Sequence, residues 1–451
     1  MGSEWTQTTV GSFCPFSYGK GLPEKKRIPN GRFIVYGSNG PVGTHDQPLV
    51  NEPGIVIGRK GTVGAVHFAS KPFWPIDTTY YVLSASGRHL KYTYYLLKSI
   101  GLENMNADSA VPGLNRNAVH AKQILVPSYD EQHTIAQILG SLDDKIELNC
   151  RMNKTLEAIA RAIFKSWFID FDPVIDNALR AGNPIPDLMA ERAEIRRQIL
   201  DQNQPSSSSP ISQRAKDWNY QEGFDFSGLG EVSIDEINGL FPDSFQDSEL
   251  GAIPKGWEVK TIGSEFRLTM GQSPPGNTYN EIGNGLPFFQ GRRDFGFRYP
   301  SHRVYCMVPQ RLSYKGDTLV SVRAPVGNIN MAMERCCIGR GVAGIRHMSN
   351  SRSYTYYAMH TLRGQFEKFE AEGTVFGAIN KKQFEEIRWI SPGENIISKF
   401  EKIAFAIDEQ IEKNTIENNT LASLRDTLLP KLISGELRVP DVEKFVKEIG
   451  L

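Results

Sequence analysis

Apolar residues recur in heptads along two long stretches of the chain, one between Ile135 and Trp167 and one between Phe400 and Leu432. The two series in the first stretch are Ile135, Leu142, Leu156 and Ile163, and Leu139, Ile146, Ala160 and Trp167. Those in the second stretch are Phe400, Ile407, Leu421 and Leu428, and Ala404, Ile411 and Leu432. Because residues at this spacing line one side of a helix, the pattern predicts two long helices, each with an apolar seam.

Two asparagines lie near the middle of each seam, Asn149 and Asn153 in the first helix and Asn414 and Asn418 in the second. If the helices pack antiparallel, their middles meet, and the four amides can hydrogen bond to one another within an apolar interface. Such pairing would fix the register of a coiled coil. The alternative is two separate amphipathic helices that each cover their own domain, although globular helices average only about three turns.

Ahead of each helix the pattern changes to short β-branched or aromatic runs separated by Gly, Pro and Asn. The run Ile55-Val56-Ile57 before the turn at 58–61 (GRKG) is one example. Runs of this kind are typical of strands joined by turns, so each of these parts is predicted to be a small α+β domain.

The chain also repeats itself once. Residues 54–66 (GIVIGRKGTVGAV) return at 317–329 (DTLVSVRAPVGNI), which aligns Lys60 with Arg323. The string YTYY that begins at residue 92 returns at residue 354. PGLNR (112–116) returns as GAINK (377–381), and LDDKIELN (142–149) as IDEQIEKN (407–414), both at a spacing of 265 residues. A duplication of this length predicts two similar domains, each followed by its own helix.

Charge is distributed unevenly over these parts, although the 451 residues carry a formal net charge of zero. Residues 1–130 hold 13 Lys and Arg against 8 Asp and Glu, and residues 256–392 hold 18 against 11. Residues 170–255 hold 7 against 16. Two basic parts joined by an acidic connector suit two DNA-contacting modules, although excesses of this size also arise by chance.

The composition indicates a globular protein that does not enter a membrane. No apolar run approaches the roughly 18 residues that a membrane-spanning helix needs, and the N-terminus shows no secretory signal, so we expect a cytoplasmic protein. The five cysteines are scattered and never spaced as CxxC, which argues against disulfides and zinc. We expect the adjacent Cys336 and Cys337 on opposite faces of a strand.

Motifs that would mark an enzyme are missing from the sequence. We find no GxxxxGK[ST] loop, no GxGxxG opening a helix, no HExxH and no GxSxG, nor an Asn-Pro-Pro-aromatic motif for holding a target base. We therefore expect no catalytic residue, no metal and no cofactor bound by this chain.

Taken together, these features resemble the specificity subunits of type I restriction-modification systems. The most specific pieces are the two helical repeats, the segments FKSWFIDFDPV and LLPKLISGEL that end them, the stretch Ala252–Trp257 (AIPKGW), and Gly373-Thr374 with Asn380. The first copy departs from this pattern, because it has Asp108-Ser109 where the second copy has Gly373-Thr374.

The resemblance implies a non-catalytic chain with an α+β fold, in which two pseudo-symmetric target-recognition domains are separated by an antiparallel coiled coil. Its expected parts are the first recognition domain (1–130), the first helix (131–170), a connector with a mobile Ser/Pro linker (171–255), the second recognition domain (256–392), the second helix (393–440) and a tail (441–451). It also implies double-stranded DNA as ligand, two methyltransferase subunits that bring S-adenosylmethionine, and restriction subunits that use ATP and Mg. The alternative is a coiled-coil scaffold with two protein-binding lobes.

Candidates for contact with DNA are polar or basic residues in glycine-rich loops. Arg and Lys can donate to guanine, and Asn and Gln can pair with adenine. Half or more of protein–DNA hydrogen bonds go to the backbone, so a phosphate contact is the commoner role for any one of them. The candidates are Ser38, Asn39, Arg59, Lys60, Gln290, Arg292, Arg293 and Arg323.

Overall fold

A computed structural model of the chain describes residues 5–105, 113–202, 237–371 and 377–439. These residues fall into two compact units, the first made of residues 1–151 and 414–451 and the second of residues 152–413. The predicted Ser/Pro linker, residues 205–209, and the loops with Asp108-Ser109 and Gly373-Thr374 lie outside the described residues.

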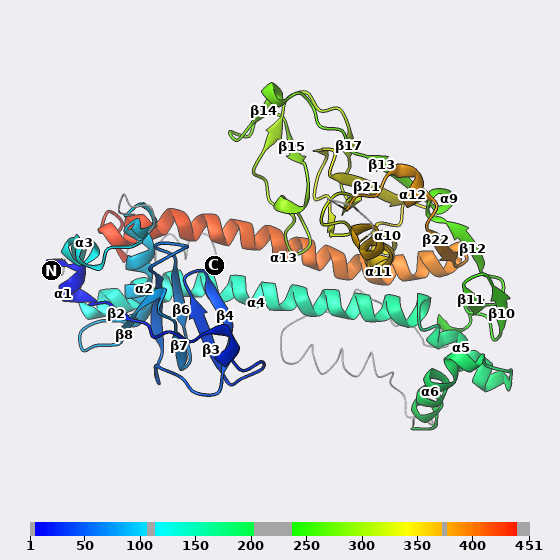
Figure 1. Ribbon diagram of the computed structural model, residues 1–451, viewed down its shortest axis with the longest axis horizontal. Coiled ribbons are helices and arrows are strands. Elements are labelled where there is room, and N and C mark those ends of the chain that lie inside the picture. The colour runs from blue at the N-terminus through cyan, green and yellow to red at the C-terminus, as the bar shows by residue number, and fades with distance from the viewer. Residues whose placement is uncertain (1–4, 106–112, 203–236, 372–376, 440–451) are drawn as a thin grey trace. The chain divides into compact units, whose positions relative to one another are not determined.

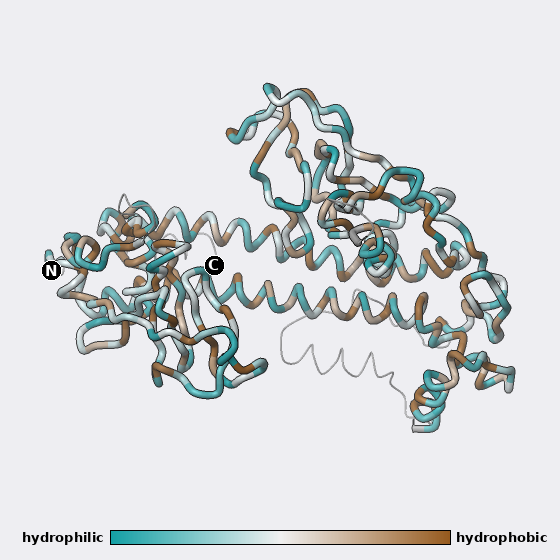
Figure 2. Tube along the Cα trace, in the orientation of Figure 1, coloured by the Kyte–Doolittle hydropathy of each residue, from teal (hydrophilic) through white to brown (hydrophobic). Residues whose placement is uncertain are grey.

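Two long helices confirm the heptad prediction: α4 (Tyr129–Phe168) has 40 residues and α13 (Glu394–Ser434) has 41. Each unit contains a stretch of both helices (Figure 1). Figure 2 shows apolar and polar residues alternating along both helices, as expected for helices with one buried side. Buried seam residues include Ile135, Leu139, Leu156, Ala160, Phe400, Ala404, Ile407, Ile411, Leu421, Leu428 and Leu432.

The first unit is an α+β domain built on an antiparallel sheet with strand order β2-β8-β5-β6, beside a three-stranded sheet β4-β3-β7. Strand β5 is buried along its whole length, which explains its unbroken run of apolar residues. The strands are β1 (Thr6–Thr9), β2 (Ser17–Tyr18), β3 (Phe33–Gly37), β4 (Gly40–His45), β5 (Gly54–Gly58), β6 (Val66–Ala69), β7 (Phe73–Pro75), β8 (Thr79–Leu83) and β9 (Gln123–Val126). Its short helices are α1 (Val10–Phe13), α2 (Leu90–Ser99) and α3 (Arg116–Ala121).

The second unit repeats this topology, which confirms the duplication. Its sheet β13-β21-β18-β19 matches β2-β8-β5-β6, and the pair β12–β22 matches β1–β9. The strands are β10 (Phe245–Ser248), β11 (Gly251–Pro254), β12 (Glu258–Thr261), β13 (Phe266–Met270), β14 (Tyr279–Asn280), β15 (Leu286–Phe289), β16 (Tyr305–Cys306), β17 (Leu312–Ser313), β18 (Thr318–Ser321), β19 (Ile329–Met331), β20 (Cys336–Ile338), β21 (Val342–His347) and β22 (Arg388–Ser391). The helices are α5 (Asp172–Ala181), α6 (Ala190–Gln202), α9 (Ile262–Glu265), α10 (Arg352–Thr361), α11 (Arg363–Ala371) and α12 (Lys381–Glu385).

Each domain shares its core with both long helices of its own unit. In the first unit, Ile55 of the sheet belongs to one apolar cluster with Leu139 of α4 and Leu432 of α13. In the second unit, Val320 belongs to one cluster with Ala160 of α4 and Ile407 of α13. The α+β fold with an antiparallel pair of long helices is thus confirmed, with part of the helix pair inside each unit.

A tyrosine of each YTYY string hydrogen bonds to an aspartate on a long helix. In the first unit the Tyr95 hydroxyl donates to Asp143 at 2.7 Å, and Arg425 binds the same carboxylate at 2.6 Å. In the second unit the Tyr357 hydroxyl donates to Asp408 at 2.9 Å. The two aspartates are equivalent in the repeat, so the same bond attaches each domain to a long helix.

The cation that binds Asp408 is Arg298, which comes from the α+β domain and is completely buried. Its guanidinium also lies 3.6 Å from the Glu157 carboxylate of α4 and over the Tyr356 ring. Although burial opposes its charge, Asp408 and the neighbouring groups keep the pKa of Arg298 well above its ordinary value. A buried charge is stable only with such partners, so this cluster fixes the second domain to both helices.

The two adjacent cysteines lie on opposite faces of β20, as predicted. Cys336 packs with Phe289 and Leu319, whereas Cys337 packs with Phe288 and Cys306. Both thiols are free and buried. Within the described part of the chain, no helix is long and apolar enough to cross a membrane.

Partly buried His360 gives the second unit a predicted acid sensitivity. Burial, with the positive charges of Arg161, Arg298 and Arg363, lowers the pKa of His360 to about 3. The unfolded chain therefore takes up this proton near pH 6.5 and the folded chain does not, so its stabilising contribution is complete above pH 6.5 and falls as the pH drops toward 3. Between pH 7.5 and 5.5 we expect a loss of about 1.4 kcal/mol in the free energy of unfolding.

The variant His360→Gln retains an acceptor for Arg161 but does not titrate. Chemical denaturation at both pH values should show wild type losing about 1.4 kcal/mol more than this variant. Equal losses in the two proteins would show that His360 is not held neutral.

Candidate DNA interface

Two turns of the first unit are held on one backbone carbonyl, that of Thr78 before β8. It accepts hydrogen bonds from the Ser38 hydroxyl at 2.7 Å, from the Arg59 backbone N–H at 2.9 Å and from the Lys60 backbone N–H at 3.2 Å. The structure therefore brings Ser38, Asn39, Arg59 and Lys60 together, although about 20 residues separate the two pairs in sequence.

The four residues differ in what they can offer a ligand. Ser38 is buried and its hydroxyl is used by Thr78, so it supports the turn. Asn39 and Lys60 are exposed, and Arg59 is half-buried. Three polar side chains of this group can therefore reach a ligand at the surface.

An aromatic and arginine cluster surrounds Arg59. Its guanidinium carbon lies 5.0 Å from the ring centre of Tyr18 and 5.8 Å from that of Tyr80, and Nη1 donates to the Asp77 carbonyl at 3.1 Å. The guanidinium carbon of Arg116 lies 4.9 Å from the Tyr18 ring centre. Sequence reasoning did not group these residues, because Tyr18, Arg59 and Arg116 belong to three distant segments.

Corresponding loops of the second unit meet at Gly341. Its N–H donates to the Gln290 carbonyl at 3.1 Å, and its carbonyl accepts from Val322 N–H at 2.9 Å, which places Gln290 beside the turn that carries Arg323. Arg323 forms an isolated bridge with Ala378, just as Lys60 does with Gly113. These two positions are equivalent in the repeat, so each unit presents a cation at the same place in its fold.

Arg292 and Arg293 are exposed at the start of a short 3-10 turn, Arg292–Asp294. The buried Asp294 carboxylate binds Arg303 Nε at 2.9 Å. Within the described residues, no ion pair is formed by Arg59, Lys60, Arg292, Arg293 or Arg323. Unpaired cations on surface loops are what a polyanion requires, because no internal pair has to break on binding.

The two recurrent asparagines at positions 115 and 380 are helix caps. The Asn115 side chain accepts from the Asn117 and Ala118 N–H groups at the start of α3, and Asn380 forms a capping box with Gln383 at the start of α12. Their recurrence therefore reflects local structure.

Two of the four seam asparagines, Asn149 and Asn418, are joined across the helix pair in the first unit. Asn149 donates to Asn418 Oδ1 at 3.0 Å and to Glu417 Oε2 at 2.8 Å. Asn153 and Asn414 are buried. The contact of Asn149 with Glu417 was not predicted, because Glu417 lies outside the apolar heptad positions.

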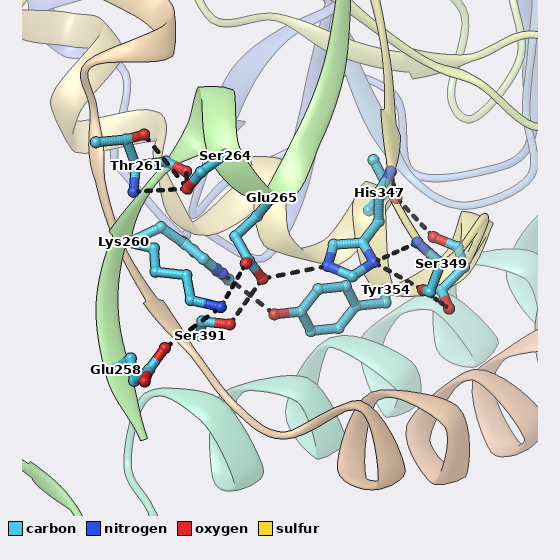
Figure 3. Close-up of polar contacts among 12 residues, drawn as sticks. Glu258, Lys260, Thr261, Ser264, Glu265, His347, Ser349, Tyr354 and Ser391 are labelled. Atoms are coloured by element: carbon cyan, nitrogen blue, oxygen red, sulfur yellow. Dashed lines mark hydrogen bonds and ion pairs between the residues drawn. The ribbon is translucent and has the colours of Figure 1, made fainter. Parts of the chain in front are cut away.

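A serine, a histidine and a glutamate line up in the second unit in the order found in hydrolases (Figure 3). His347 Nδ1 lies 2.7 Å from Ser349 Oγ, and Nε2 lies 3.5 Å from the Glu265 carboxylate. The Ser349 backbone N–H also donates to the same Nδ1 at 3.1 Å, and burial lowers the pKa of His347. Glu265 is bound by Lys260 at 3.0 Å.

The N-terminus of α10 follows Ser349 in sequence, but it cannot act as an oxyanion hole for a reaction at Ser349. The N–H groups of Arg352, Ser353 and Tyr354 in α10 all donate to the Glu401 carboxylate, at 3.0–3.2 Å. These three side chains therefore form a structural link between the end of α9 and the end of β21. Among the described residues, no cluster of three His, Cys, Asp or Glu side chains could hold a metal ion.

Comparison with known proteins gives concordant matches. Residues 2–158 match the family model described as type I restriction modification DNA specificity domain. A Methanocaldococcus jannaschii relative, named for the specificity subunit of the type I restriction enzyme MjaX, is 38% identical over 202 residues, which cover 44% of this chain and 47% of the relative. The type I restriction enzyme HindI specificity subunit of Haemophilus influenzae is 27% identical over 344 residues, which cover 72% of this chain and 71% of the relative.

The fold is similar to that of a solved structure. The crystal structure of the type I restriction-modification system S subunit from M. genitalium superposes with a TM-score of 0.55 at 18% sequence identity, and the match covers 96% of both chains. At this identity the likeness concerns the fold alone.

Equivalent glycines close the two cation-bearing turns. The Gly64 N–H donates to the Gly58 carbonyl, and the Gly327 N–H donates to the Ser321 carbonyl, both at 2.8 Å. Gly64 has φ +77°, and a Cβ on it would lie 2.3 Å from the Glu103 nitrogen. Gly61 in the same turn has φ +81° but open space around it.

We expect Gly64→Ala to lower the free energy of unfolding by about 3–5 kcal/mol, since a left-handed backbone and a clash both oppose it. The matched control Gly61→Ala should cost only about 1–2 kcal/mol, because it meets the backbone penalty alone. Calorimetric unfolding of both variants gives the comparison. Equal costs would mean that the turn around Arg59 is not tightly packed at Gly64.

Proposed function

The chain belongs to the family of type I restriction-modification specificity subunits, and on this premise we propose that it reads a bipartite, asymmetric site in double-stranded DNA. The observation that carries the proposal is the duplicated α+β unit, in which equivalent turns present the cations Lys60 and Arg323, neither of which forms an ion pair with another described residue. A small domain contacts few base edges, so two domains in one chain multiply specificity. In this role the chain is a recognition subunit and not the catalyst.

We further propose that the chain positions two methyltransferase subunits on the recognised site. Methylation of a base requires its removal from the base stack, and the pocket for that base belongs with S-adenosylmethionine in the methyltransferase partner. Restriction subunits would bring ATP and Mg to the same assembly. All of these proteins act on DNA inside the cell, so a cytoplasmic location follows from the proposal.

The long helices are proposed to set the gap between the two halves of the DNA site. Support comes from their length and from the polar contact of Asn149 with Asn418 inside the largely apolar seam. Polar residues in such seams specify register at some cost in stability. The rival function, a scaffold with two protein-binding lobes, predicts no dependence of DNA binding on the loop cations.

Removing the unpaired cations of the second unit should weaken DNA binding by the complex with methyltransferase subunits. For Arg292→Ala, Arg293→Ala and Arg323→Ala combined, three lost phosphate contacts would reduce the slope of log affinity against log salt by about 2.7. Titration of labelled duplex DNA at several salt concentrations measures this slope.

The matched control is Arg363→Ala, which removes an exposed arginine that is paired with Glu367 at 3.2 Å. It should leave both affinity and slope unchanged. If the triple variant binds as wild type does, the scaffold explanation is favoured and the proposed DNA contact is wrong.

Replacement of all four seam asparagines with leucine should raise the thermal unfolding temperature but disturb the recognised site. Apolar seam residues pack better and no longer specify one register, and a slip of one helical turn displaces the helices by about 5 Å. A methylation map of host DNA should then show sites that are lost or have altered gaps.

The neighbouring variant Asn419→Leu is the control, since Asn419 is exposed on α13. It should alter neither the sites nor the gap. If the quadruple variant methylates the wild-type sites at the wild-type rate, the asparagines do not set the register.

A further inference from the structure

Arg59 differs from the other loop cations because both its backbone and its side chain are held in place by hydrogen bonds. The backbone N–H donates to the Thr78 carbonyl at 2.9 Å, and the backbone carbonyl accepts from Leu114 N–H at 2.8 Å. At the end of the side chain, Nη1 donates to the Asp77 carbonyl at 3.1 Å. Three fixed points along one residue leave its guanidinium little freedom to move.

Aromatic rings hold the guanidinium from the side. It lies over Tyr18 and Tyr80, whose rings meet edge to face with centres 5.1 Å apart. The Tyr80 hydroxyl donates to the Leu114 carbonyl at 3.1 Å, so this ring is fixed as well. Arginine stacked on tyrosine keeps its hydrogen-bonding edges free while its plane is restricted.

Several donors of this guanidinium remain available at the surface. An arginine has five N–H groups, and the structure assigns one of those on Arg59 to Asp77. Tyr18 is 49% exposed, so the stack lies at the surface of the unit. Lys60, the next residue, is exposed and stacks on no aromatic ring in the part of the chain that the structure describes.

The two chemistries of DNA contact place different demands on an arginine. A phosphate accepts from many directions, so a flexible side chain suffices, as for Lys60. A base edge requires two donors in one plane at a fixed place, and guanine with its O6 and N7 acceptors is the base that arginine reads in this way. Immobilising Arg59 would limit phosphate binding but improves base reading, because less side-chain entropy is lost on contact.

We infer that Arg59, held by Asp77 and stacked on Tyr18 and Tyr80, reads one guanine in the half-site bound by the first unit. Tyr18 is then a positioning residue, which acts through Arg59. The inference rests on the proposed function and adds to it the identity of one base and the residue that selects it.

The test is a methylation map made with the complete complex, the full chain together with its methyltransferase subunits, on a library of duplex sites. Wild type should require guanine at one position of one half-site. Arg59→Ala should lose this preference by about 5- to 150-fold at that position and leave the other half-site unchanged. Arg59→Lys keeps the charge but lacks the planar guanidinium group, so it should lose the same guanine preference. This variant can replace Arg59→Ala in the test if the alanine variant is unstable.

The stacking is tested by a pair of variants at Tyr18. Tyr18→Phe keeps the ring and should keep the guanine preference. Tyr18→Leu should weaken the guanine preference at the same base position as Arg59→Ala does. A general loss of stability would lower methylation at every site and would not change one base position. Lys60→Ala, the matched control, should weaken methylation of all sites evenly.

Three results would count against the inference in distinct ways. If Arg59→Ala lowers methylation of all sites evenly, Arg59 is a phosphate contact and the inference is wrong. If the relaxed position does not require guanine in wild type, the assigned base is wrong. If the wild-type complex methylates no bipartite site at all, the proposed function fails, and that outcome is seen without any variant.

Discussion

A carboxylate on each long helix, Asp143 in α4 and Asp408 in α13, attaches the α+β domain of its unit to that helix. The cost of removing such a group from water is met by a tyrosine hydroxyl of the domain and by an arginine. Loops that carry the candidate DNA contacts can have a defined position only if their domain is fixed, so this bond underlies every contact farther out. The same tyrosine string and the same helix position are used twice, which explains why both recur in the repeat.

The two units balance the aspartate charge with arginines from different places. In the first unit Arg425 comes from α13 and the Asp143 side chain keeps 24% exposure, whereas in the second unit Arg298 comes from the domain and Asp408 is completely buried. A charge pair in water-accessible surroundings is worth about 0–1 kcal/mol, but breaking a buried one costs about 3–5 kcal/mol. The second domain is therefore attached more firmly at this point than the first.

Sequence periodicity was sufficient for the parts of this fold that depend on repeated local rules. Heptads predicted both helices, and the internal repeat predicted two similar domains. It could not predict contacts between distant segments. The stack of Arg59 on Tyr18 depends on how β2 and β5 align around β8, and the burial of Ser38 depends on a carbonyl 40 residues away. Whether the candidates contact DNA remains a prediction.

A net charge of zero is compatible with DNA binding by the second domain because the acids of that domain are largely used internally. In the second unit Glu265, Asp294 and Asp317 each bind a Lys or Arg side chain and are nearly or partly buried. The exposed loop arginines Arg292, Arg293 and Arg323, by contrast, have no ion pair among the described residues. At physiological salt the Debye length is about 8 Å, so a phosphate at a loop senses the nearby unpaired cations and little of the remaining chain. The local pairing of charges, and not their sum, therefore decides which surface attracts a polyanion.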